Sequence, residues 1–315
     1  MSTRGEFLGA ITLAAIAPAV PRFPAVLQKP PMLERGDRVG LIAPASPPTG
    51  DDVARATANV ESLGLVPVLG EYVRRQNGFL AGSDGERAAD FNAMARDPKI
   101  RAIVAIRGGY GTMRILSALD YAAIARDPKI VMGFSDLTAL LNAVTERSGV
   151  VTFHGPVGAH GSSWNGVARS YLEAALFAAQ PQRLRIGSLR TILPGRARGR
   201  LAGGNLSLVA ALLGTPYAVP AAGALLFLEE TEEQPYRIDR MLTQLELAGD
   251  LAAARGILFG QCSKCAGAGP TPAKRPVTVS ERTETEAILL DQPTAGNPPL
   301  REGDQVVIPK AAPSS

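Results

Sequence analysis

The chain has few of the imidazole and thiol side chains that often act as bases, nucleophiles or metal ligands. Of its 315 residues only two are histidine, His154 and His160, so nothing after Gly161 can serve as an imidazole base. The two cysteines, Cys262 and Cys265, are too few for a disulfide framework. Their Cys-x-x-Cys spacing has no second pair, and histidine is scarce, so we expect no metal site and interpret the two thiols as incidental.

The chain also lacks a strong excess of charge. It carries 33 basic and 29 acidic residues, scattered along its length, for a formal net charge of +4. This balance argues against a nucleic-acid partner. Its length and its 46% hydrophobic content are typical of one large or two medium globular domains, and we expect no membrane span in the mature chain.

Residues 1–29 differ from the rest and read as a signal-like leader. Arg4 precedes an uncharged stretch over residues 7–20, which is too short to span a bilayer and contains small-x-small sites. The leader resembles a twin-arginine export signal in which the second arginine has become Gly5. A working signal would place the protein in the periplasm or cell envelope. A decayed leader would leave it in the cytoplasm.

Residues 30–160 alternate strand and helix patterns, which predicts an α/β domain with a parallel, flavodoxin-like or Rossmann-like sheet. We expect strands at 37–43, 65–69 and 102–106 and helices near 51–63, 86–95 and 113–119, with folded sequence from about Leu33. The segment Ala-Arg-Asp-Pro-Lys-Ile occurs at 95–100 and again at 125–130, each time leading into a buried strand and a glycine-bearing turn. The turns at Gly108 and Ser135 should therefore lie side by side.

The second of these turns carries the strongest chemical signal. An apolar strand ends at Gly133, and a helix with one apolar stripe begins near Leu137, which leaves Ser135 in a sharp strand-to-helix turn. Such a turn presents a serine hydroxyl at a helix N-terminus, where a developing negative charge is stabilised. The alternative is that Ser135 or Asp136 merely caps the helix, since both types are preferred at that position.

Beyond residue 160 the pattern changes. We interpret residues 161–198 as a linker and residues 199–315 as a second, smaller α/β domain. In it, the apolar strand 224–228 ends in Glu229 and Glu230, followed by a helix over 237–247 and a strand over 256–260. The two glutamates could form a charged turn, or one of them could be functional.

Seven segments carry a family resemblance through their order and spacing: Leu41–Ser46, Arg107–Gly111, Gly133–Leu140, Gly203–Leu206, Leu213–Pro216, Leu228–Glu230 and Pro235–Leu242. Together they resemble the LD-carboxypeptidase family of serine peptidases, which includes the microcin C immunity hydrolases. The resemblance covers roughly residues 31–261 and implies two α/β domains with a serine–glutamate–histidine triad between them. It also implies hydrolysis of the L,D bond to the terminal D-alanine of a murein tetrapeptide, without metal or cofactor.

The resemblance assigns a role to four residues of this chain. Ser135 corresponds to the nucleophile and Glu229 to the carboxylate that orients the base, while the backbone N–H groups of Gly108 and Asp136 correspond to the oxyanion hole. The partner implied is a peptidoglycan-derived peptide. The sequence does not fix the oligomeric state, and a homodimer is one possibility.

The chain departs from the family at its third triad member. The family has a Gly-His pair near the C-terminus, and no such pair is present here. His154 lies in the Phe-His-Gly-Pro segment, which in the family neighbours the nucleophile strand, and we expect no hydrogen bond from it to Ser135. Residues 266–315 are rich in Pro, Gly and Thr and are typical of a tail read in another frame, or of a degenerate one. The alternative to an active hydrolase is therefore a catalytically silent peptide-binding member.

Overall fold

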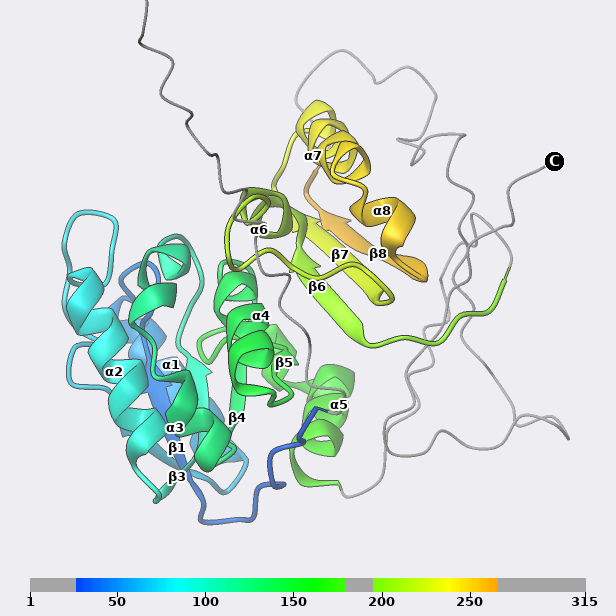
Figure 1. Ribbon diagram of the computed structural model, residues 1–315. Coiled ribbons are helices and arrows are strands. Elements are labelled where there is room, and N and C mark those ends of the chain that lie inside the picture. Colours follow the sequence, from blue (N-terminus) through cyan, green and yellow to red (C-terminus); the bar gives the residue numbers. More distant parts are fainter. Residues whose placement is uncertain (1–26, 179–194, 266–315) are drawn as a thin grey trace, which may run out of the picture.

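The computed structural model describes residues 27–178 and 195–265, which form two parallel-sheet α/β units (Figure 1). The first sheet has five strands in the order β2-β1-β3-β4-β5, with every neighbouring pair parallel. The predicted fold class, a parallel-sheet domain with a smaller second domain, is confirmed. The strands of the first sheet are β1 (Arg38–Ile42), β2 (Val66–Leu69), β3 (Ile100–Ala105), β4 (Ile130–Gly133) and β5 (Phe153–His154).

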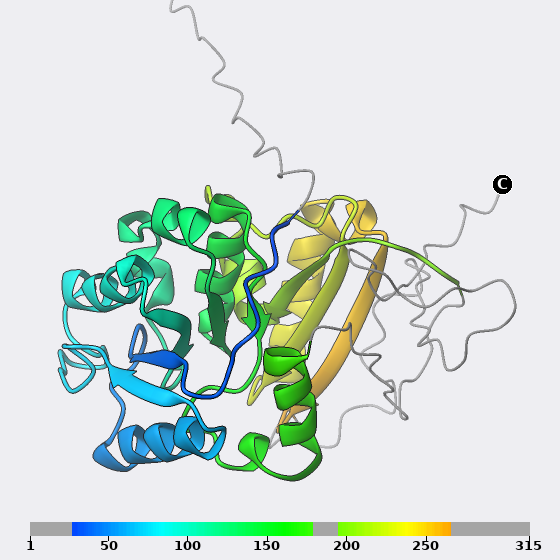
Figure 2. The ribbon, with the colours of Figure 1, turned by 90° about the horizontal axis from the view of Figure 1, so that it is seen from below.

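Helices cover both faces of this sheet, because its strands are apolar on both sides. Figure 2 shows α1 and α5 on one side and α2, α3 and α4 on the other. The region predicted as a helix over 113–119 is the 3-10 helix η1. The bounds are α1 (Gly50–Ser62), α2 (Asp84–Arg96), η1 (Thr112–Ala118), α3 (Tyr121–Arg126), α4 (Leu137–Ser148), η2 (Ser162–Trp164) and α5 (Gly166–Phe177).

Two boundaries differ from the sequence interpretation. Residues 166–177, assigned to the linker, form helix α5, whose Leu172 and Leu176 are buried in the core of the first domain. Gln28, assigned to the leader, already forms a parallel bridge with Val150 in the segment before β5, because its N–H donates to Gly149 O at 2.8 Å and its C=O accepts from Val151 N. The first domain therefore begins earlier and ends later than expected.

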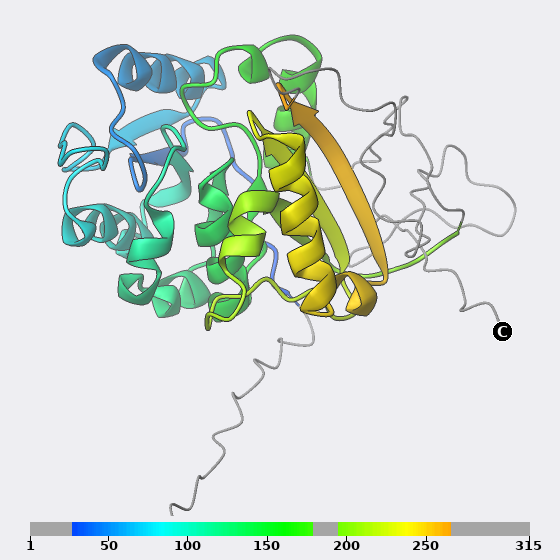
Figure 3. The same cartoon turned by 90° about the horizontal axis from the view of Figure 1, so that it is seen from above.

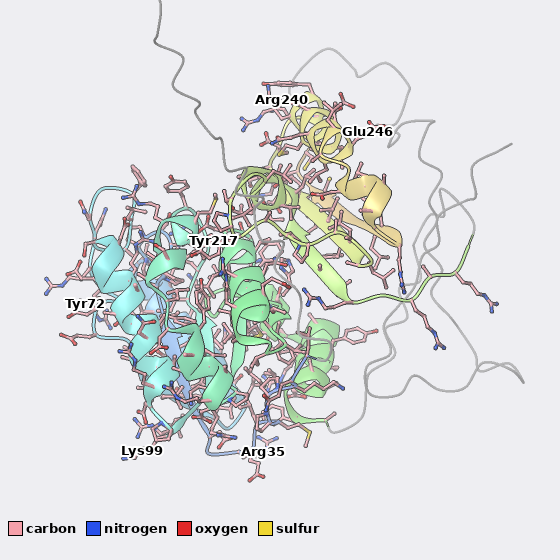
Figure 4. All side chains as sticks on the ribbon, viewed as in Figure 1. Arg35, Tyr72, Lys99, Tyr217, Arg240 and Glu246 are labelled. Carbon is pink, nitrogen blue, oxygen red and sulfur yellow. The ribbon has the colours of Figure 1, made fainter. Side chains whose placement is uncertain are left out.

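The second sheet has three parallel strands in the order β6-β7-β8, namely β6 (Leu201–Asn205), β7 (Leu225–Thr231) and β8 (Gly256–Ser263). Its helices are α6 (Leu206–Ala211), α7 (Pro235–Leu247) and α8 (Asp250–Ala253), and α7 lies along one face of the sheet (Figure 3). Its buried residues Ile238, Leu242 and Leu245 recur at helical spacing. The exposed Arg240 and Glu246 lie on its outer surface (Figure 4).

The two domains share one apolar core cluster and meet where α4 packs against β6. Asn142 Nδ2 of α4 donates to Gly203 O at 2.8 Å, and Asn205 N of β6 donates to Thr138 Oγ1 at 2.9 Å. A side chain at Gly204 would lie 2.7 Å from Thr138 Oγ1, so the close approach of the domains requires glycine at this position. Helix α4 therefore connects the turn at Ser135 to the second domain.

Some sequence predictions fall on residues outside the described ranges. The predicted export signal covers residues 1–29, of which residues 1–26 lie outside the described part of the chain, and so does the whole atypical tail, residues 266–315. Within the described part, no helix is both long enough and apolar enough to cross a bilayer.

Candidate active site at the domain junction

The turn between β4 and α4 holds Ser135 in a left-handed backbone conformation, with φ of +63°. Left-handed conformations cost energy for residues other than glycine, and they cluster at functional sites. Gly133 makes the turn feasible, because a Cβ atom there would lie 2.6 Å from Leu137 Cγ. The half-buried serine thus stands in a strained strand-to-helix turn, as the spacing of Gly133, Ser135 and Leu137 predicted.

The capping alternative does not account for this turn. Asp136 is the N-cap residue of α4, but its side chain makes no capping hydrogen bond. Instead, its buried carboxylate accepts from Thr112 N at 2.9 Å, while Thr112 Oγ1 donates to Asp136 O at 2.5 Å. Burial raises the pKa of the Asp136 carboxyl. Asp136 therefore fastens the start of α4 to η1, which fixes the turn from behind.

Gly108 lies directly against the serine turn. Strands β3 and β4 are parallel neighbours, with Val104 opposite Met132, so their carboxyl ends meet at one edge of the sheet. A Cβ atom at Gly108 would lie 3.2 Å from both Ser135 Cβ and Phe134 O. The predicted adjacency of Gly108 and Ser135 is confirmed, and the approach is close enough that a larger residue would push the turn away.

Glu229 and Glu230 lie inside β7 and are buried, so the interpretation as a charged turn is wrong. The two carboxylates have different environments. Glu230 accepts from Asn205 Nδ2, from Thr231 N, and from both the N–H and the hydroxyl of Ser207, at 2.7–2.9 Å. Oε1 of Glu229 is buried without a hydrogen-bond partner. Burial, together with the neighbouring charge of Glu230, raises the pKa of Glu229 to about 7.

His154 lies in β5, opposite Gly133 of β4, and its ring packs against Phe227 of the second domain. Its Nε2 is 3.7 Å from Glu229 Oε1. Both ring nitrogens are buried without a hydrogen-bond partner, so neither bonds to the Ser135 hydroxyl, as expected from the sequence. Burial lowers the pKa of His154 to about 4. The exposed His160 is bonded instead to Ser163, with Nδ1 and Oγ 2.8 Å apart.

The contact between His154 and Glu229 is the feature that sequence reasoning missed. The two residues stand 75 positions apart and belong to different sheets, so only the packing of α4 on β6 brings them together. Glycine at position 204, which permits that packing, was visible in the sequence. Its role in the packing of the two domains was not, because a glycine within a strand has several uses.

The strain at Ser135 leads to a stability prediction. Glycine adopts a left-handed conformation without cost, so Ser135→Gly should be more stable than Ser135→Ala by about 1 kcal/mol. The alanine variant is the matched control, because it also loses the hydroxyl but keeps the Cβ atom that causes the strain. Urea unfolding of both variants measures the difference, and equal midpoints would contradict a strained turn.

Comparisons with known proteins extend over both domains. Residues 39–155 match the model of the LD-carboxypeptidase N-terminal domain, and residues 198–300 match that of the LD-carboxypeptidase C-terminal domain. A probable murein peptide carboxypeptidase of Bacillus subtilis is 40% identical over 277 residues, covering 87% of this chain and 84% of that protein. A murein tetrapeptide carboxypeptidase of Pseudomonas aeruginosa is 34% identical over 238 residues, covering 72% of this chain and 77% of that protein.

The fold also resembles a solved structure. MccF in complex with glutamyl sulfamoyl guanosine superposes with a TM-score of 0.70 at 23% identity, covering 79% of this chain and 84% of that chain. At this identity the likeness concerns the fold alone. It shows that the two parallel-sheet domains belong to a known arrangement.

Proposed function

The chain belongs to the LD-carboxypeptidase family, and from that premise we propose that it is a serine hydrolase acting on murein-derived peptides. The bond cleaved would be the L,D bond to the terminal D-alanine of a tetrapeptide. The observation that carries this proposal is the turn at Ser135, strained to φ of +63° and pressed against Gly108 at the end of the neighbouring strand. A family member in which Ser135 had only a structural role would not need this backbone strain.

In the proposed reaction Ser135 Oγ attacks the carbonyl carbon of the scissile bond. The negative charge that develops on the carbonyl oxygen would be stabilised by two backbone N–H groups, that of Gly108 after β3 and that of Asp136 at the N-terminus of α4. D-Alanine leaves as its amine takes up the proton that the serine hydroxyl has given up, and water then hydrolyses the acyl-serine, which restores the hydroxyl and releases the shortened peptide. The bonds from Asp136 to Thr112 would hold this oxyanion site in place during the attack.

Attack by Ser135 needs a base that takes the proton of its hydroxyl. The chain has two histidines, and His154 is the one that lies at the domain junction, with both nitrogens unpartnered. Its place beside Glu229 rather than on the serine hydroxyl favours a second candidate function. In that function the chain binds murein peptides at the same site without turning them over.

One experiment separates the two functions. Wild type and Ser135→Ala are each incubated with murein tetrapeptide and with the same peptide ending in L-alanine, while calorimetry measures binding. Release of D-alanine by wild type above the Ser135→Ala background, with no release of L-alanine, is expected for the hydrolase. Selective binding by both proteins with equal, background release would support the silent binder. Absence of binding by both proteins would overturn both functions.

A further inference from the structure

Three buried polar atoms converge at the domain junction without a hydrogen-bond partner. They are Nδ1 and Nε2 of His154 and Oε1 of Glu229. Buried polar atoms are nearly always hydrogen-bonded, since an unsatisfied one loses its bonds to water and gains none in return. Such a cluster therefore needs an explanation, and the short distance of 3.7 Å between Nε2 and Oε1 points to one.

The surroundings leave the imidazole few polar groups to contact. Phe134 and Phe227 pack edge-on against its ring, with centroids 5.2 and 5.6 Å away. On the β6 side the backbone of Gly204 closes the site, because a Cβ atom there would lie 3.1 Å from Cε1. The ring is thus held in an apolar slot, and the acidic group that it faces is Glu229.

The other titratable groups near the pair are accounted for. Glu230 of β7 uses both carboxylate oxygens in bonds to Asn205, Ser207 and Thr231. On β8, Cys262 lies opposite Glu230, and burial and Cys265 raise the pKa of its thiol to about 12. The remaining contacts of the imidazole come from Phe134 in the turn after β4, from Phe227 of β7 and from Gly204 of β6, which carry no charge.

We propose that His154 is a positioning residue for Glu229, and that the two side chains share one proton. The carboxyl O–H of Glu229 donates to Nε2 of the neutral imidazole once a small side-chain rotation closes the 3.7 Å gap. No bond other than this hydrogen bond forms, and the proton stays within the pair. The bond fixes Oε1 toward β5 and directs the other oxygen into the site. The inference rests on the proposed function only in treating Glu229 as a functional residue.

The electrostatics of the slot agree with a neutral pair. Burial raises the pKa of Glu229 to about 7 and lowers that of His154 to about 4, so the carboxyl is the better holder of the proton. Two neutral groups joined by a hydrogen bond avoid the cost of burying two separated charges in an apolar slot.

Histidine-selective ¹⁵N NMR on the full chain tests this pair without requiring turnover. The chain has two histidines, so His154→Gln assigns both ring signals by the disappearance of one. We expect the Nε2 shift of His154 to carry a step near pH 7 as Glu229 ionises, and Glu229→Gln to abolish that step. Glu232→Gln is the matched control, because Glu232 is exposed and paired with Lys264 just beyond β7. It should leave the step intact.

A His154 signal that is flat from about pH 5 to 9, or a step that survives in Glu229→Gln, would overturn the pair. If Glu229→Gln does not fold, the ¹³C carboxyl signal of Glu229 in wild type and in His154→Gln reports the same coupling. Its midpoint should move when the imidazole is removed, and an unmoved midpoint would overturn the pair as well. Because none of these readouts uses peptide, a failure of the proposed function would leave their result unchanged.

Discussion

Added imidazole should accelerate D-alanine release from murein tetrapeptide by this protein. Alone, the protein should release D-alanine about 10⁴–10⁶-fold more slowly than a relative with a complete serine–glutamate–histidine triad, because loss of the base leaves the serine proton in place. If Ser135 is the nucleophile and Glu229 the carboxylate, as we propose, free imidazole can act in place of the missing ring. The rate should therefore rise in proportion to the concentration of neutral imidazole.

Two controls make this prediction specific. Ser135→Ala should show no acceleration, since no hydroxyl remains to be activated, and imidazole at pH 5 should accelerate little, since most of it is protonated. The measurement is D-alanine released per unit time across an imidazole series. Rapid release without imidazole that is lost in His154→Ala would contradict the prediction, because it would make His154 the base.

The serine turn was predictable because its determinants are local. Gly133, Ser135 and Leu137 stand within five residues. Glycine at position 133 avoids a clash with Leu137, and the apolar stripe that starts at Leu137 marks the beginning of the helix. The adjacency of Gly108 was predictable for a different reason. Parallel strands end at the same edge of a sheet, so the repeated segment thirty residues apart fixes which turns are neighbours.

What the sequence did not reveal depends on contacts between distant elements. Glu229 reads as the end of an apolar run, yet it lies within β7 because the strand continues to Thr231 beside β8. Residues 166–177 read as a mixed segment, yet Leu172 and Leu176 bury one face of α5 in the first domain. In both cases the deciding partner is far away in the chain, and local composition carries no record of it.

Single replacements of Glu229 and His154 should change the pH dependence of stability in opposite directions. The pKa of Glu229 is raised to about 7, against 4.5 in the unfolded chain. Below about pH 4.5 the carboxyl is protonated in both states, so its ionisation does not affect the free energy of unfolding there. Above that pH the unfolded state ionises first, so stability falls as the pH rises to about 7. For His154 the folded pKa is about 4 against 6.5, so stability falls as the pH drops from about 6.5 to 4.

Each of these contributions is on the order of 3 kcal/mol, because the pKa of each group in the folded chain differs by about 2.5 from its ordinary value. In wild type they nearly cancel between about pH 4.5 and 6.5. Glu229→Gln leaves the histidine alone, so relative to wild type it should gain stability as the pH rises from about 4.5 to 7. His154→Asn leaves the carboxyl alone, so relative to wild type it should gain stability as the pH falls from about 6.5 to 4.

Urea unfolding of the full chain at half-unit steps from pH 4 to 8 measures these differences. Subtracting the wild-type curve removes every group that titrates alike in all three proteins, including Asp90, whose pKa burial raises to about 6. His160→Asn is the matched control, because it removes the exposed imidazole bonded to Ser163, and its curve should run parallel to wild type. If all variant curves ran parallel to wild type, Glu229 and His154 would titrate in the folded protein as they do in the unfolded chain. The junction would then be open to water rather than the dry slot in which an imidazole can hold a carboxyl proton.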